Sequence, residues 1–298
     1  MTLTRYGIRE WGGCGLIAIV LLMGCWLLGR YVHVALGVLP ALIVLIAYGA
    51  LCYFFRNPHR TPPDNPEFIV SPADGEVRDI GEVDGFDQKP FEGKALRVGI
   101  FLSVLNVHVN RAPAAFQVLT KHYRAGKYLD ARSKECAKEN EAMTIAGYAT
   151  VNDEDFPMAV RQISGAIARR IVCAAEPGSK WTRGKIYGMI KFGSRTELYL
   201  PVDERFELLV KPGDKVKGGT TVIARFNSGK RSNGLVDEDK RFFPPEEEVN
   251  GPGSRWDIPG NGCDEATEAV DAGDKSVNAN ENIDACCNEQ NKEQNKVQ

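Results

Sequence analysis

The sequence has little of what metal and redox motifs are built from. It holds only four histidines, and none of its eight cysteines forms a C-x-x-C pair. That spacing is typical of zinc sites and thioredoxin-like sites, so neither is expected, and we predict no metal site. The formal net charge is −2. A chain without a basic excess has no electrostatic footprint for nucleic acid, so we predict no nucleic-acid partner.

Charged side chains are missing from two long stretches near the N-terminus. Residues 11–29 and 34–55 carry none, and only residues 30–33 separate them. Each stretch is near the ~20 residues that a helix needs to cross a ~30 Å hydrocarbon core. A cleaved signal peptide would be followed by a polar mature region, not by a second apolar run. We therefore predict a membrane helical hairpin over residues 1–55, with a re-entrant hairpin as the alternative.

The charges that flank this hairpin predict its orientation. Arg5 and Arg9 precede it and Arg56 and Arg60 follow it, whereas the turn holds only Arg30. Basic residues are enriched in the cytoplasmic loops of membrane proteins. The pattern predicts that both ends of the hairpin face the cytoplasm from the cell (inner) membrane, and that the domain after it is cytoplasmic.

Proline and turn residues divide the rest of the chain. Residues 56–66 hold four prolines in eleven positions and predict a linker, because proline interrupts helix and central strand alike. Residues 67–229 alternate short apolar runs with turn signals, which predicts a mainly β (α+β) domain. Within it only residues 163–174 have helical spacing, and their valine and isoleucine content leaves a strand open. Residues 230–298 lose this pattern: from 257 to 298 there are ten acidic residues, three lysines and no aromatic residue, which predicts an acidic, disordered tail.

Three short segments hold side chains that can carry chemistry, and each is weak evidence on its own. Asp74 lies in Pro-Ala-Asp-Gly, which is a common turn sequence. His108 lies between an apolar run and a proline, where a histidine is more often structural than catalytic. Ser194 follows Gly193, but without the G-x-S-x-G pattern of α/β-hydrolases. Only the combination of the three points to a function.

Taken together, these segments resemble the phosphatidylserine decarboxylase family, in its short, pyruvoyl-dependent bacterial form. The resemblance covers about residues 50–226 and rests on matching segments in matching order, at 54–58, 71–75, 101–113, 140–141, 169–171, 192–195 and 200–201. It implies a barrel-sandwich-like β core and a carboxy-lyase activity. It also implies a phospholipid substrate in the membrane.

The resemblance further implies a proenzyme that cuts itself. The Ser194 hydroxyl would attack the carbonyl of Gly193, which gives a β chain of residues 1–193 and an α chain of residues 194–298. Ser194 would become a covalent pyruvoyl group, the cofactor that forms a Schiff base with phosphatidylserine and allows CO2 to leave, giving phosphatidylethanolamine. By resemblance, His108 and Asp74 would activate Ser194 in the manner of a serine-protease triad. Arg195 is a candidate for binding the lipid phosphate or carboxylate, with a plain surface arginine as the alternative.

Departures from the family pattern leave alternatives open. Longer members carry two histidines as H-x-x-H, whereas this chain has His108 alone, so His108 serves both steps or another group such as His122 fills one of them. The substrate could be another serine lipid, archaetidylserine. A non-enzymatic, membrane-tethered, lipoyl-like carrier or scaffold is the third possibility, because residues 211–219 resemble a lipoyl-domain turn, with Lys191 as the nearest acceptor. The oligomeric state stays open, and a homo-oligomer is possible.

Overall fold

The computed structural model describes residues 2–86, 88–91, 93–133, 135–166, 170–191 and 194–228. All of them belong to one structural unit, Met1–Val249. The acidic tail predicted over residues 230–298 lies outside the described residues, and so does Gly193. The division of the chain into hairpin, linker, catalytic domain and tail stays a prediction.

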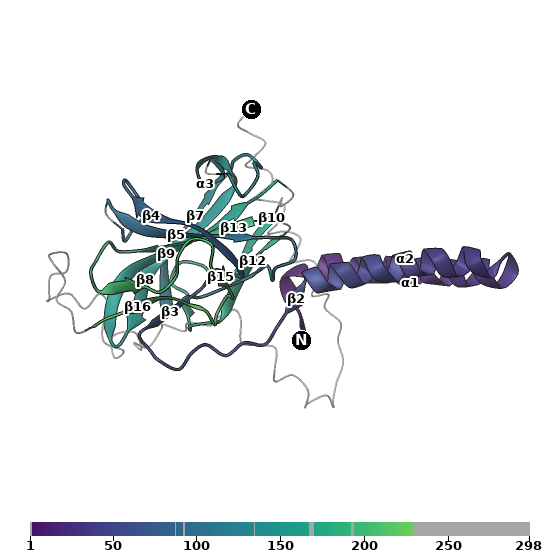
Figure 1. The fold of residues 1–298 in the computed structure, drawn as a ribbon, viewed down its shortest axis with the longest axis horizontal. Coiled ribbons are helices and arrows are strands. Elements are labelled where there is room, and N and C mark those ends of the chain that lie inside the picture. The colour runs from purple at the N-terminus through teal and green to yellow at the C-terminus, as the bar shows by residue number, and fades with distance from the viewer. Residues whose placement is uncertain are drawn as a thin grey trace, which may run out of the picture. The chain divides into compact units, whose positions relative to one another are not determined.

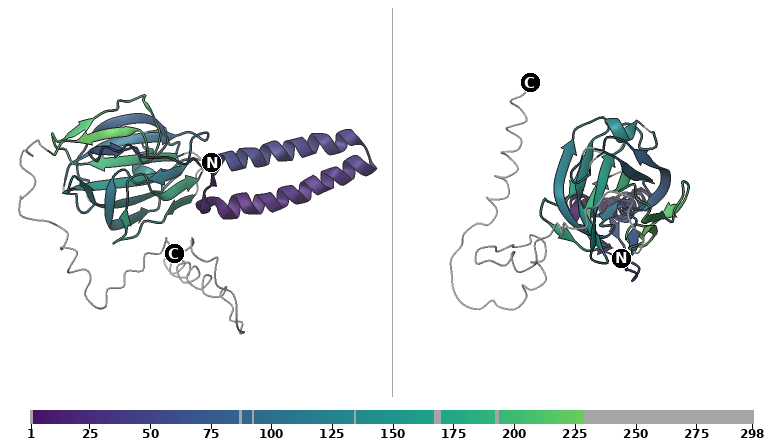
Figure 2. Two further views of the ribbon diagram at one scale, coloured as in Figure 1. Left: turned by 90° about the horizontal axis from the view of Figure 1, so that it is seen from below. Right: turned by 90° about the vertical axis from the view of Figure 1, so that its left-hand side faces the viewer.

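Two apolar helices stand at the start of the chain (Figure 1). Their bounds, with those of the short elements beside them, are β1 (Thr2–Leu3), a 3-10 turn (Arg5–Gly7), α1 (Ile8–Tyr31), α2 (Val34–Phe54) and β2 (Arg56–Asn57). Strands β1 and β2 pair antiparallel and so tie the two ends of the hairpin together. Figure 2 shows the helices running antiparallel, side by side.

The sequence explains why the hairpin reverses where it does. His33 lies between the helices, and its Nδ1 accepts the N–H of Ala35 at 3.2 Å, which caps α2. Both helices are long and apolar enough to span a membrane. Their apolar side chains stay exposed, with Leu16 at 69 % and Ile43 at 67 %. Such all-round apolar helices are stable where lipid replaces water.

The remainder of the described chain is mostly strand, so the predicted mainly β fold is confirmed. An eight-stranded antiparallel sheet has the order β11-β7-β8-β9-β13-β5-β4-β15 (Figure 1). Its strands are β4 (Gly75–Val83), β5 (Ala95–Leu102), β7 (Ala115–Arg124), β8 (Ala142–Val151), β9 (Glu154–Ser164), β11 (Lys180–Trp181), β13 (Ser194–Leu200) and β15 (Lys215–Val216).

Two further sheets of three strands complete the domain, in the orders β10-β12-β6 and β14-β16-β3. Their strands are β3 (Phe68–Val70), β6 (Val109–Arg111), β10 (Arg170–Cys173), β12 (Ile186–Lys191), β14 (Phe206–Leu208) and β16 (Val222–Phe226). A single turn of helix, α3 (Cys136–Glu139), lies between β7 and β8.

Strand β13 runs through the centre of the large sheet, and each of its residues is buried. Successive side chains of a strand point to opposite faces. Leu198 and Leu200 join the main apolar core, whereas Tyr199 packs with Phe86 in a smaller cluster on the other face. Because of this alternation, Ser194 lies on the same face of β13 as Leu198 and Leu200, whereas Arg195 lies on the face of Tyr199.

Residues 163–166 and 170–174 are described and none of them is helical, so the strand that the valine and isoleucine content left open is the correct alternative there. Strand β9 continues to Ser164, and Arg170–Cys173 forms β10, which pairs with β12. β9 is flanked by β8 and β13, and most of its residues are buried. Burial does not alternate along β10, where one residue is exposed and three are half-buried, so the period of two that identifies a strand is missing from this stretch.

Candidate active site

Ser194 is the first residue of β13. It pairs in register with Leu102 of β5 and with Ser164 of β9. Ser194 and Ser164 are both fully buried, and neither Oγ has a hydrogen-bond partner among the described residues. A buried polar group without a partner is unfavourable by about 1–3 kcal/mol. The sheet therefore holds an unsatisfied hydroxyl at the predicted cleavage position, and Gly193, the other half of that bond, lies outside the described residues.

His108 comes to the same place from the β10-β12-β6 sheet. It directly precedes β6, and its carbonyl accepts the N–H of Ile190 in β12 at 3.2 Å. Strand β12 ends at Lys191, and β13 begins three positions later at Ser194. The pairing of β6 with β12 thus brings His108 to the end of the strand that leads into Ser194.

A buried polar network joins the two sheets beside these residues. Asn110, two positions after His108, donates from Nδ2 to Thr196 Oγ1 at 3.0 Å. Thr196 is two positions after Ser194 and therefore lies on the same face of β13. Gln162 of β9 donates from Nε2 to Asn110 Oδ1 at 2.9 Å. These contacts hold the face of β13 that carries Ser194 against β6, the strand that directly follows His108, and no local sequence pattern predicts them.

Burial keeps the His108 imidazole neutral at pH 7. The side chain is fully buried, with its ring centroid 4.4 Å from that of Phe54 at the end of α2. Burial lowers the pKa of His108 to about 4; the Arg56 charge acts in the same direction, and the Asn106 carbonyl and Asp74 oppose it. Nδ1 lies 2.9 Å from the Asn106 carbonyl oxygen, which can only accept. Nδ1 therefore carries the proton, and Nε2 is the basic nitrogen.

The Asp74 carboxylate is held by an arginine from the proline-rich segment. Arg60 pairs with both carboxylate oxygens, with 2.7 Å between Nη2 and Oδ2, and the Gly218 N–H donates to Oδ1 at 2.8 Å. Asp74 acts on His108 through its charge, which raises the imidazole pKa. Its role as the partner of His108 stays a prediction. Arg60 is a site residue that is recognisable in the sequence only as a charge flanking the hairpin.

Arg195 lies on the opposite face of β13 from Ser194. Its guanidinium is buried and pairs with Asp79 at 2.7 Å and with Glu197 at 2.9 Å. Although burial acts against it, the hydrogen bonds and charges of these two carboxylates raise the pKa of Arg195 above its ordinary value. The substrate-binding role of Arg195 stays untested, and its contacts favour a structural role.

We expect Arg195→Met to lower stability rather than substrate affinity. The change removes the 2.9 Å contact of the buried Glu197 carboxylate and leaves it with the Tyr199 hydroxyl and with Arg97 and Arg161 at 3.8 Å, so the free energy of unfolding should fall by about 1–3 kcal/mol. Thermal unfolding of the detergent-solubilised chain measures this loss. The matched control is Arg78→Met, which removes a half-exposed pair with Glu76 and should change stability by less than about 1 kcal/mol. Normal stability with a raised KM for Arg195→Met would instead establish a substrate contact.

Two residues considered from the sequence do not join this site. His122 is exposed on β7, and strands β8 and β9 separate β7 from β13. Lys191, the candidate acceptor of a carrier domain, is nearly buried and its Nζ bonds to the Glu10 carboxylate at the start of α1. An acceptor lysine must be accessible to a modifying enzyme, so this geometry disfavours the carrier interpretation.

The sequence is similar to those of known proteins. A sequence model of the phosphatidylserine decarboxylase family matches residues 48–224. The chain is 42 % identical over 207 residues to a protein of Carboxydothermus hydrogenoformans, covering 66 % of this chain and 94 % of that one. It is 39 % identical over 209 residues to a Geobacter protein, covering 70 % and 90 %. A Pelobacter propionicus protein is 46 % identical over 185 residues, covering 62 % and 80 %. All three are named phosphatidylserine decarboxylase proenzyme. The chain belongs to the phosphatidylserine decarboxylase family.

Proposed function

We propose that this chain cuts itself between Gly193 and Ser194 and then converts phosphatidylserine to phosphatidylethanolamine and CO2. The observation that carries the proposal is the buried Ser194 hydroxyl without a hydrogen-bond partner among the described residues, beside the strand that follows His108. The name that the relatives share supports both the proenzyme state and the substrate. Nothing comparable supports the carrier alternative or archaetidylserine.

In the self-cleavage step, His108 acts as the base. Nε2 takes the hydroxyl proton of Ser194 while Oγ attacks the carbonyl carbon of Gly193. The C–N bond then breaks as this proton passes to the departing nitrogen, so that the acyl group moves from nitrogen to oxygen. A base then removes the α-proton of Ser194, and the Cβ–Oγ bond breaks. This releases the Gly193 carboxylate, which becomes the C-terminus of the β chain. Water replaces the nitrogen of the remaining dehydroalanine, and ammonia departs. Burial keeps the imidazole unprotonated at neutral pH, so Nε2 is in the state that accepts a proton.

The surroundings of Ser194 fit a pyruvoyl group made from that residue. The Ser194 hydroxyl, which the reaction would consume, makes no hydrogen bond to a described residue, so its loss breaks none. When present, the pyruvoyl group supplies an electron-withdrawing ketone that binds the substrate amine and accepts the electrons released with CO2. In the same site His108 can hold the proton that the product carbon receives, and the Asn110–Thr196 bond keeps the two strands in place.

The end of the domain beside His108 suits a lipid surface. The loop that leads to His108 exposes Val104 at 45 % and Leu105 at 71 %. Arg56 joins this loop to the base of the hairpin, because its Nη2 donates to the Leu105 carbonyl at 2.7 Å while its guanidinium lies 3.8 Å from the Tyr53 ring centroid. We infer that the loop meets the head groups and that the domain is cytoplasmic, as the flanking arginines predict.

Decarboxylation of phosphatidylserine by the purified full chain tests the proposed function. Mixed micelles that contain phosphatidylserine labelled in the serine carboxyl group should release labelled CO2 and leave phosphatidylethanolamine. Archaetidylserine in the same assay, and Ser194→Ala as the protein control, separate the alternatives. A cut chain that decarboxylates neither lipid would contradict the proposal.

The depressed His108 pKa predicts how stability depends on pH. Because the pKa is about 4 in the folded chain and about 6.5 when unfolded, the unfolded state binds more protons between these values. Stability is therefore complete above pH 6.5 and falls as the pH decreases toward 4, by about 2 kcal/mol between pH 7 and pH 5. Thermal unfolding of Ser194→Ala and of Ser194→Ala/His108→Gln at several pH values measures the contribution of His108 to this pH dependence. An equal pH dependence in both variants would refute the low pKa.

A further inference from the structure

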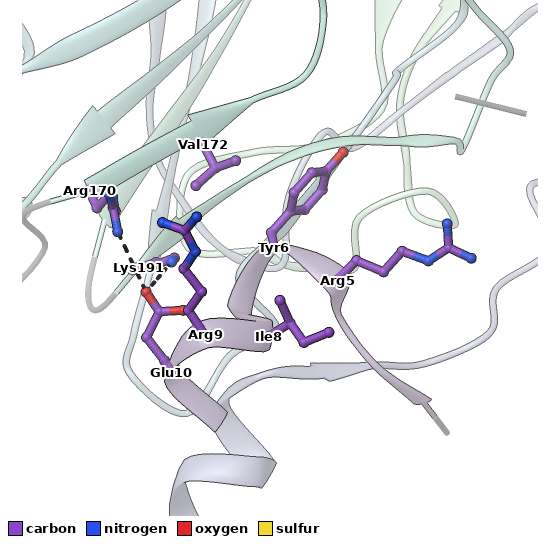
Figure 3. A pocket seen from close by; sticks show the side chains of 8 residues that line it. All are labelled: Arg5, Tyr6, Ile8, Arg9, Glu10, Arg170, Val172 and Lys191. Atoms are coloured by element: carbon purple, nitrogen blue, oxygen red, sulfur yellow. Dashed lines mark hydrogen bonds and ion pairs between the residues drawn. The ribbon is translucent and has the colours of Figure 1, made fainter. Parts of the chain in front are cut away.

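A basic cavity lies where the hairpin meets the β domain. It has a volume of about 280 Å³, far above the roughly 10–15 Å³ that one water molecule needs. Four basic side chains line it beside one carboxylate and one phenol, namely Arg5, Arg9, Arg170, Lys191, Glu10 and Tyr6. Figure 3 shows Arg9 and Tyr6 rising from the start of the hairpin toward the strand that carries Val172.

The acidic residue does not balance this charge. Glu10 Oε1 bonds to Lys191 Nζ and lies 3.8 Å from Arg170 Nη1, whereas Oε2 is buried without a partner among the described residues. Neither Arg5 nor Arg9 has a carboxylate within 4.0 Å in the described part of the chain. The cavity therefore keeps an excess of positive charge, and its chemistry suits an anion with several oxygen atoms.

The cavity adjoins the proposed active site. Lys191 is the last residue of β12, three positions before Ser194, and three residues of extended chain span at most about 10 Å. Tyr6 packs in one cluster with Phe54 and Phe55, and the Phe54 ring touches His108. Residues that line the cavity thus share neighbours with the catalytic histidine.

The cavity also lies at one end of the two helices that are able to span a membrane. Arg5 and Arg9 stand at the start of the first helix that is able to span a membrane. In phosphatidylserine only four covalent bonds separate the phosphorus atom from the amine nitrogen. A phosphate held in the cavity would therefore keep the amine close to Lys191, three positions before Ser194.

We propose that this cavity binds the phosphodiester of the substrate lipid, with Arg9 and Arg170 as its main ligands and the Lys191–Glu10 pair as its floor. The inference rests on the proposed function and adds a recognition site to it. The arginine guanidinium groups match phosphate oxygens in pairs, whereas Lys191 is already engaged by Glu10. The cavity would bind the phosphate of the lipid, and the group at position 194 would bind its amine.

Lipid binding to the uncut chain tests this site without relying on turnover. Ser194→Ala protein in a neutral detergent is titrated calorimetrically with dioctanoyl phosphatidylserine, dioctanoylglycerol and inorganic phosphate. We expect binding of the phospholipid, none of dioctanoylglycerol, and weaker binding of inorganic phosphate. Adding Arg9→Gln or Arg170→Gln should weaken phospholipid binding about tenfold or more, since each change removes a charge-assisted contact. Arg9→Lys, which keeps the charge, should weaken it less.

The matched control is Arg30→Gln, which removes the same charge at the other end of the hairpin and should leave affinity unchanged. Unchanged affinity in Arg9→Gln and Arg170→Gln would overturn the site. Inorganic phosphate that binds as tightly as the lipid would overturn the lipid as its ligand. If the wild-type chain is never cut but the uncut chain binds phosphatidylserine through Arg9, the proposed function fails and the site stands. If the enzyme is cut and active while both variants bind normally, the site fails alone.

Discussion

Ser194→Ala will remain a single uncut chain of 298 residues, whereas the wild type will separate into chains of 193 and 105 residues (298 − 193). The alanine has no hydroxyl to attack the preceding carbonyl. The methyl group fits the site, because Ser194 is fully buried and its Oγ makes no hydrogen bond to a described residue, so the fold should not change. A denaturing gel with intact mass measurement separates the two outcomes.

Ser164→Ala is the matched control for this variant. Ser164 lies opposite Ser194 in register, is equally buried, and has the same unpartnered hydroxyl. It is not adjacent to the predicted cleavage bond in the chain, so Ser164→Ala should still be cut. Cleavage of Ser194→Ala at the normal position would show that an external protease makes the cut.

His108→Ala will also accumulate as uncut chain. A positioned base contributes about 10²–10⁴-fold to a proton-transfer step, and self-cleavage should slow by that factor. The His108 Nε2 is basic because Nδ1 donates to the Asn106 carbonyl, and the pKa of about 4 keeps the ring neutral. The chain is best made by cell-free synthesis, so that the appearance of the 105-residue chain can be followed from the start.

His122→Ala is the control for the histidine variant. His122 is exposed on β7, with β8 and β9 between it and the Ser194 strand, so its loss should change neither cleavage nor turnover. Normal cleavage of His108→Ala with loss of decarboxylation would restrict His108 to the second reaction. Slow cleavage in His122→Ala would show that His122 takes part in self-cleavage, contrary to the proposal.

The sequence was sufficient to predict the elements that depend on composition. Long uncharged runs require lipid or a large core, so the two helices followed directly from residues 11–29 and 34–55. Short apolar runs between turn signals predicted a mainly β domain, which the sheets confirm. The error over residues 163–174 arose because burial does not alternate along β10, so the period of two that identifies a strand is missing.

The site was harder to predict because its contacts join residues far apart in the chain. Arg60 binds Asp74 across fourteen positions, out of a proline-rich segment that reads as a spacer. Asn110 meets Thr196 across eighty-six positions, and no local pattern signals that contact. For Arg195 a signal was available: adjacent residues of a strand face opposite sides, so a residue next to Ser194 turns away from it.

The mass of the chain that begins at residue 194 tests the central claim most directly. Purified wild-type protein should contain two chains. Conversion of Ser194 to a pyruvoyl group is a net loss of one ammonia, so the 105-residue chain should be lighter by that mass than the same chain with a serine terminus. A single 32.8 kDa chain, or a 105-residue chain with an unmodified serine terminus, would contradict the account.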